Sequence, residues 1–130
     1  MKKLKLLLVM AISCVVLVGC SNNKLSDAFN EEELKTTSQN VIKMLYNEEY
    51  DKIEEKSSKN LIDAGVTEKL KEVWPPIAKD LGKLESFDKE AVVGKGEEAT
   101  VVTVTNFKNG KAQFTISYNE DMELTGIYIK

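Results

Sequence analysis

The sequence predicts an α+β domain in which N-terminal helices pack on one face of a four-stranded antiparallel meander sheet, with a cone-like shape. Before Gly82 the apolar residues recur at helical spacing, and after Gly82 they recur at every second residue. Turn-forming residues divide this second part into four short runs. A chain with helices first and strands afterwards is typical of a domain whose helices lie on one sheet face.

The first helical stretch covers residues 31–46. Asn30, followed three residues later by Glu33, resembles a capping pair, and the glutamates around it favour a helix N-terminus. A short second helix is expected over residues 50–55, and residues 57–60 are expected to form a loop. The apolar stripe of the first helix consists of Leu34, Val41, Ile42, Leu45 and Tyr46.

A third helix is expected to begin near Thr67, a residue type that caps helices, and to end at Gly82. Pro75 and Pro76 lie in its middle, where proline removes an amide donor and clashes with the preceding turn. Because the apolar stripe stays in phase across them, the sequence predicts either a kink or a new helix that begins at a proline. The stripe consists of Leu70, Val73, Trp74, Ile77 and Leu81.

The strands are separated by three turn signals. Gly94–Gly96 and Asn119–Asp121 are typical turn sequences, and Asn109-Gly110 favours a type I′ hairpin turn. Gly126 is expected to mark a bulge in the last strand. The four strands are expected over residues 87–93, 100–107, 111–118 and 123–129.

The Asn109-Gly110 turn assigns residues to two faces of the sheet. The face of the last strand stays open, because a change of one residue in loop length inverts it. The helix-facing set pairs Phe107, Thr105, Thr103 and Val101 with Ala112, Phe114, Ile116 and Tyr118. The opposite set, which suits partial exposure, is Thr100, Val102, Val104, Gln113, Thr115 and Ser117.

The beginning of the chain is a leader. Lys2, Lys3 and Lys5 precede an apolar run over residues 6–18, as in a secretory signal peptide. This run is shorter than the roughly 20 residues that a membrane-spanning helix needs. A permanent transmembrane anchor is therefore the weaker interpretation.

The leader ends in Leu17-Val18-Gly19-Cys20, which resembles the bacterial lipobox. The resemblance implies a diacylglyceryl group on the Cys20 thiol and cleavage between Gly19 and Cys20; two acyl chains hold a protein stably on a membrane. The alternative is an accidental cysteine at the end of a signal peptide or short anchor. The expected organisation is a lipoprotein signal peptide at 1–19, the lipidated cysteine and a short tether at 20–24, and one α+β domain at 25–130.

Charge and composition exclude several classes of function. Removing the three leader lysines lowers the net charge from −3 to −6, and every positive charge is a lysine. An acidic surface without arginine disfavours nucleic-acid binding. Because histidine is absent, the chain cannot build a Ser-His or Cys-His nucleophile or an imidazole metal site. The acidic residues at 48–55 are interleaved with Lys52 and lack calcium-loop spacing, so they indicate a solvated helix surface.

Three segments carry a resemblance to an uncharacterised family of small exported bacterial domains. Its members occur as Gram-positive lipoproteins and as appendages to hydrolase domains, and it is similar in fold to the nuclear-transport-factor-like, cystatin-like and ketosteroid-isomerase-like cone. The resemblance implies a helix-lined concave sheet with a pocket, leaves a homodimer open and implies no activity. The segments are Tyr50–Ile53, Thr67–Trp74 continuing through Leu81–Leu84 to Phe87, and Gly110–Tyr118 through Leu124–Tyr128.

The residues expected to line such a pocket are Tyr46, Trp74, Phe114 and Tyr118. Catalytic members of the cone superfamily use a carboxylate in an apolar pocket as a base. Here the acids fall at the ends of the expected strands, so no carboxylate is expected in the middle of the Phe114-bearing face. Aromatic residues at helical spacing usually fill a core.

The sequence therefore favours a lipid-anchored binding or interaction domain on the extracytoplasmic face of the cell membrane. Its partner would be an unknown protein or a small apolar ligand, besides the membrane itself through Cys20. The alternative is a small-molecule enzyme of the isomerase or dehydratase kind that uses a pocket carboxylate and a tyrosine. No catalytic residue, metal ligand or cofactor is predicted.

Overall fold

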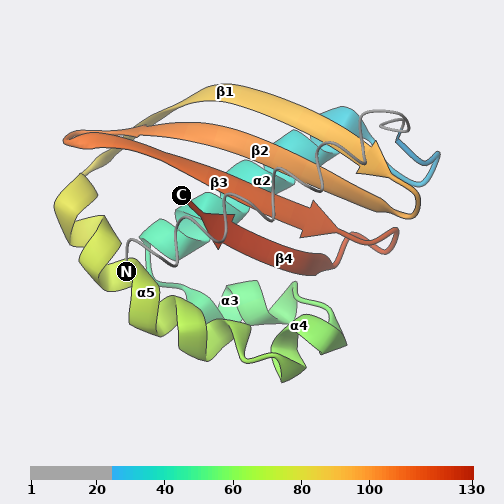
Figure 1. Cartoon of the computed structure of the whole chain (residues 1–130), viewed down its shortest axis with the longest axis horizontal. Coiled ribbons are helices and arrows are strands. Elements are labelled where there is room, and N and C mark those ends of the chain that lie inside the picture. The colour runs from blue at the N-terminus through green and yellow to red at the C-terminus, as the bar shows by residue number, and fades with distance from the viewer. Residues whose placement is uncertain (1–24) are drawn as a thin grey trace.

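A computed structural model describes residues 25–130, so the predictions for the leader, Gly19 and Cys20 lie outside the described residues. The strands form one antiparallel sheet in chain order, and the helices pack against it, which confirms the predicted fold class (Figure 1). The helices are α2 (Glu31–Tyr46), α3 (Tyr50–Glu55), α4 (Lys59–Asp63) and α5 (Val66–Leu81). The strands are β1 (Leu84–Lys95), β2 (Glu98–Phe107), β3 (Gly110–Tyr118) and β4 (Leu124–Ile129).

The start of α2 is as the sequence predicts. The side chain of Asn30 accepts a hydrogen bond of 3.0 Å from the backbone N–H of Glu33, which satisfies one free donor of the first turn. The predicted stripe is buried except for Tyr46, which is half-buried, and Tyr50 and Ile53 of α3 also face the core. In Figure 1, α2 runs along one face of the sheet while α3, α4 and α5 lie together below β4.

Helix α4 corrects the expectation of a loop over residues 57–60. The hydroxyl of Ser58 accepts a hydrogen bond of 3.2 Å from the N–H of Leu61 and so caps this five-residue helix. A helix this short has no room for an apolar repeat, so periodicity does not reveal it. The backbone around it is tied to β4, because the Ser58 N–H donates to the carbonyl of Leu124 at 2.8 Å.

Helix α5 differs from the prediction at its start and in its middle. It begins at Val66 after Gly65, while the hydroxyl of Thr67 donates to the Glu54 carboxylate at 2.6 Å instead of capping the helix. One helix continues through Pro75-Pro76, so a second helix beginning at a proline is wrong. Val73 is 45% exposed, because it lies at the edge of the stripe formed by the other apolar residues.

The hairpin between β2 and β3 has a different register from the predicted one. Phe107 pairs with Gly110, so the two turn residues are Lys108-Asn109, and Thr103 pairs with Phe114. This register is shifted by two residues from the one that the Asn-Gly signal favoured. Because side chains alternate with a period of two, the shift changes every pair and leaves every residue on its predicted face.

Contacts with the end of α5 explain this turn. The N–H of Lys108 donates to the carbonyl of Lys83 at 2.8 Å, and the N–H of Asn109 donates to the carbonyl of Leu81 at 2.9 Å. Gly82 lies against the same turn, where an added Cβ would come within 2.9 Å of the Asn109 side chain. Tertiary hydrogen bonds to the helix end therefore take precedence over the local turn preference.

The edge strands complete the sheet. β1 is longer than expected and reaches Lys95, so its turn is Gly96-Glu97 and not residues 94–96. β1 also carries two register irregularities, and the β3–β4 pairing shifts beside Gly126, as the bulge prediction required. Among residues 25–130, no helix combines the length and apolar character needed to cross a membrane.

Candidate functional site

The side of the sheet that faces the helices, here called the inner face, holds an aromatic cluster. The ring centroids of Trp74 and Phe114 are 5.9 Å apart, and Phe107 lies 6.3 Å from Trp74 and 6.4 Å from Tyr46. The structure therefore brings together three of the four predicted pocket residues, and it adds Phe107, which the sequence placed on this face without a role. Such tilted aromatic contacts stabilise a core beyond the area that they bury.

This aromatic cluster is closely packed. Trp74, Phe114 and Tyr118 have no exposed surface, so no water-sized space lies against their side chains. Helix α5 supplies Trp74, and the inner positions of β2 and β3 supply the residues that contact it. These predicted pocket residues are core residues in this structure, and their use in contacting a ligand stays a prediction.

The fourth predicted pocket residue, Tyr118, makes a polar contact with α2. Its hydroxyl shares a hydrogen bond of 2.8 Å with the hydroxyl of Ser38, which is also fully buried. Burial raises the pKa of Tyr118 to about 12, and the hydrogen bond with Ser38 lowers it to a smaller extent. The phenol is therefore neutral at physiological pH, and it ties α2 to the end of β3.

A carboxylate also lies on the inner face, which corrects the expectation that this face lacks one. Glu90 pairs with Thr103 in the middle of β1, on the same face as Phe114, and is half-buried. Its two oxygens accept hydrogen bonds from Gln39 of α2 at 2.9 Å and from Thr103 at 3.4 Å. The prediction placed Glu90 at a strand end, which was wrong even for the expected strand over residues 87–93, because Glu90 is its central residue.

Glu90 and Tyr118 are the carboxylate and tyrosine that an isomerase-like reaction would need. Their partners, Gln39 and Ser38, are neighbours on α2, so both groups belong to one polar layer between α2 and the sheet. Both oxygens of Glu90 are engaged by neutral donors, and the Tyr118 hydroxyl is sealed from solvent. The enzyme alternative stays a prediction, and the arrangement in this structure serves to hold α2 in place.

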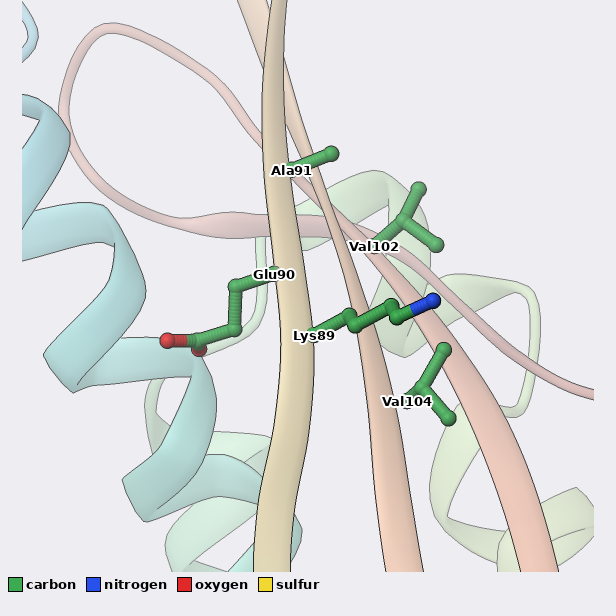
Figure 2. Close-up of a pocket in the computed structure, with 5 residues that line it drawn as sticks. All are labelled: Lys89, Glu90, Ala91, Val102 and Val104. Carbon is green, nitrogen blue, oxygen red and sulfur yellow. The ribbon is translucent and has the colours of Figure 1, made fainter.

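The opposite side of the sheet, here called the open face, offers a surface instead. Figure 2 shows Lys89, Ala91, Val102 and Val104 pointing away from α2, while Glu90 points toward it. A shallow depression of about 490 Å³ is lined by these four residues and by Glu90, although the Glu90 side chain points to the other side of the sheet (Figure 2). Ala91 is exposed, and Val102 and Val104 are half-buried, as predicted for this face. Covering apolar surface of this kind with a partner is favourable, because it removes that surface from water.

The rest of the open face is polar and aromatic. Tyr128, which pairs with Thr115, is 46% exposed, and the two residues share this face. Thr115 was predicted to be partly exposed, but it is buried. It lies between Val102 of β2 and Tyr128 of β4, whose side chains are larger. Among the described residues, no group of three metal-ligating side chains could hold a metal ion. The open face offers a partner apolar side chains to bury and the amine of Lys89.

The sequence identified the open-face residues of β2 and β3 but missed those of β1. The reason is the irregularity between Phe87 and Lys89, which changes the phase of alternation within the strand. From Lys89 onward the alternation is regular, since Ala91 pairs with Val102. This short alternating run was the sequence signal for the open-face residues of β1. Which of its two sides faces outward could be assigned only from the pairing of β1 with β2.

Comparisons with known proteins agree with this fold. A model of a family described as "Protein of unknown function (DUF3887)" matches residues 38–127. No curated protein matches the chain. An NMR structure of a protein from Ruminococcus gnavus ATCC 29149 has a TM-score of 0.72 and 19% identity, and the match covers 82% of this chain and 96% of that chain. At this identity the likeness shows a shared fold alone.

Proposed function

We propose that this chain, which belongs to the DUF3887 family of proteins of unknown function, is an extracytoplasmic binding domain that is anchored through a lipid on Cys20. The partner docks on the open face of the sheet. The observation that carries the proposal is the apolar depression formed by Ala91, Val102 and Val104 on a side of the sheet opposite to the helices. Valine is also favoured in strands by its β-propensity, so the depression that these residues line, and not their identity alone, supports the proposal.

The energetics support docking at this place. Burying a fully exposed valine side chain contributes roughly 1.5–3 kcal/mol, and the half-buried Val102 and Val104 contribute only part of this when a partner covers them. Aromatic residues such as Tyr128 are common at binding surfaces. The inner face is rigid and already buried, so a partner can bind the open face without disturbing the core. Binding therefore costs little reorganisation of the domain.

The sequence of the leader supports the anchor. Cys20 would carry the lipid, and Leu25, the first described residue, follows it by five positions. Five extended residues span at most about 18 Å, so an anchored domain stays next to the membrane surface. A short tether raises the local concentration of the domain near any partner at that surface.

The binding proposal is tested by photo-crosslinking of the full chain in its own host. A benzophenone amino acid placed at Val104 should form a discrete protein adduct, because this side chain lies in the depression. The same amino acid placed at Glu72, an exposed position of α5, is the matched control and should give none. Equal adducts at both positions, or none at Val104, would remove the support for docking on the open face.

The same experiment has an arm for the anchor. The Cys20→Ala variant should lose metabolic labelling with an alkyne fatty acid and leave the membrane fraction. Cys14→Ala, a cysteine change within the leader, should keep both. A Cys20→Ala protein that still carried the fatty acid would contradict the anchor and leave the binding result intact.

A further inference from the structure

The meander topology gathers acidic residues at one end of the molecule. At one end lie the start of α2, the β1–β2 turn and the β3–β4 turn; at the other lie the α5–β1 connection and the β2–β3 turn (Figure 1). The first end carries Asp27, Glu31, Glu32, Glu33, Glu97, Glu98, Glu120, Asp121 and Glu123. The second end carries Lys79, Lys83, Lys108 and Lys111 together with Asp80, Glu85 and Asp88, so its charges nearly balance.

The open face carries two lysines of its own, away from the acidic end. Lys89 pairs with Val104 beside the depression, and Lys130 pairs with Gln113 on the same face. Among residues 25–130, neither amine has a carboxylate within 4.0 Å, whereas Lys111 contacts Asp88 at 3.4 Å. An acidic chain therefore presents unpaired lysines near its half-buried valines.

The first described residues lie at the acidic end, away from the open-face lysines (Figure 1). The described chain begins at Leu25, and its neighbour Ser26 donates a hydrogen bond to Glu120, so the chain enters the domain at the acidic end. A domain anchored through Cys20 would have this acidic end nearest the membrane. Anionic headgroups repel carboxylates and attract lysines, and the lysines near Val104 lie toward the far end.

We infer that the open face binds an acidic segment of another protein, an inference that rests on the proposed function. One apolar side chain of that segment fills the depression among Ala91, Val102 and Val104, and flanking carboxylates lie against Lys89 and Lys130. Complementary charge selects such a partner over neutral or basic ones, and burial of the apolar side chain supplies the affinity. This identifies the partner by its chemistry: carboxylates on both sides of one apolar residue.

The test uses the full chain in neutral detergent micelles with ¹³C-labelled valine methyl groups. The probe is a short peptide with a central leucine flanked by glutamates. It should shift the methyl signals of Val102 and Val104 and leave those of Val41, which is buried in α2, unchanged. The matched peptide with lysines in place of the glutamates should shift none of them at the same concentration.

Charge reversal sharpens the same measurement. Lys89→Glu should weaken binding of the acidic peptide about fivefold or more, and raising NaCl from 50 to 200 mM should weaken it further. Lys69→Glu, an exposed position on α5, is the matched control and should bind normally. Equal binding of acidic and basic peptides, no shift at millimolar acidic peptide, or the same shifts on adding unlabelled copies of this chain would each overturn the inference.

The two proposals fail in distinguishable ways. If the acidic peptide does not bind while the Val104 crosslink persists in cells, the partner is not acidic and the binding function stands. If the crosslink is absent as well, the open face is not a docking surface and both proposals fall.

Discussion

The two faces of the sheet are built from alternate residues of the same strands and have opposite roles. Thr103 is fully buried against the helices, whereas Val104, the next residue, borders the open depression. Glu90 is engaged by Gln39 and Thr103, whereas Lys89 beside it faces solvent. Packing of the core therefore occupies the inner face almost completely, which leaves the open face free to evolve for binding.

The inner face also holds two polar pairs. The Ser38–Tyr118 and Gln39–Glu90 hydrogen bonds both join α2 to the sheet. Buried hydrogen bonds of this kind contribute little net stability but are costly to break from one side. Changes on the inner face should therefore alter the free energy of unfolding, and changes on the open face should alter binding.

The largest difference in stability is expected when an aromatic residue of the inner face and one of the open face are each replaced by alanine. Phe114→Ala should lower the free energy of unfolding by about 3–5 kcal/mol, because it opens a cavity beside Trp74 and Phe107. Tyr128→Ala, on the open face of the adjacent strand, should lower it by less than about 1 kcal/mol. Urea denaturation of both variants measures the difference, and similar losses would break the distinction between the faces.

An intermediate effect is expected at alkaline pH. Burial raises the pKa of Tyr118 to about 12 in the folded state, whereas an unfolded tyrosine titrates near 10.0. The stabilisation is complete below pH 10 and is lost as the pH rises through 12, by about 2–3 kcal/mol in total. Unfolding measured from pH 8 to 12 should show this loss in the parent chain.

Tyr118→Phe is the control for the alkaline effect. It removes the titrating hydroxyl and leaves Ser38 without its partner, so the variant should be less stable at neutral pH. Its stability should fall less between pH 10 and 12 than that of the parent chain. A parallel decline in the two proteins would show that other groups cause the alkaline loss.

The smallest effect compares two neighbours on β1. Glu90→Ala should cost about 1 kcal/mol, because it removes the acceptor for Gln39 and for the fully buried Thr103. Lys89→Ala should change stability by less than about 0.5 kcal/mol. Thermal unfolding of the two variants measures this difference in stability. A larger loss of stability for Lys89→Ala than for Glu90→Ala would contradict the assignment of faces.

Local patterns determined much of this fold from the sequence. The Asn30 cap, the inward residues of α2 and the alternation in β2 and β3 depend on contacts within a few residues, so spacing alone revealed them. The helices-then-strands order was sufficient to predict the α+β architecture. The leader with Cys20 is likewise a local signal, and its role stays a prediction.

Only the tertiary structure decided the hairpin register, the faces of the edge strands and the place of the candidate site. The Lys108-Asn109 turn follows from hydrogen bonds to Leu81 and Lys83, which are distant in sequence. The irregularity in β1 sets Glu90 inward and Lys89 outward. Backbone hydrogen bonds between separate elements leave no residue pattern in a single sequence. The residues of β1 that share the open face could therefore be identified only from the strand pairing.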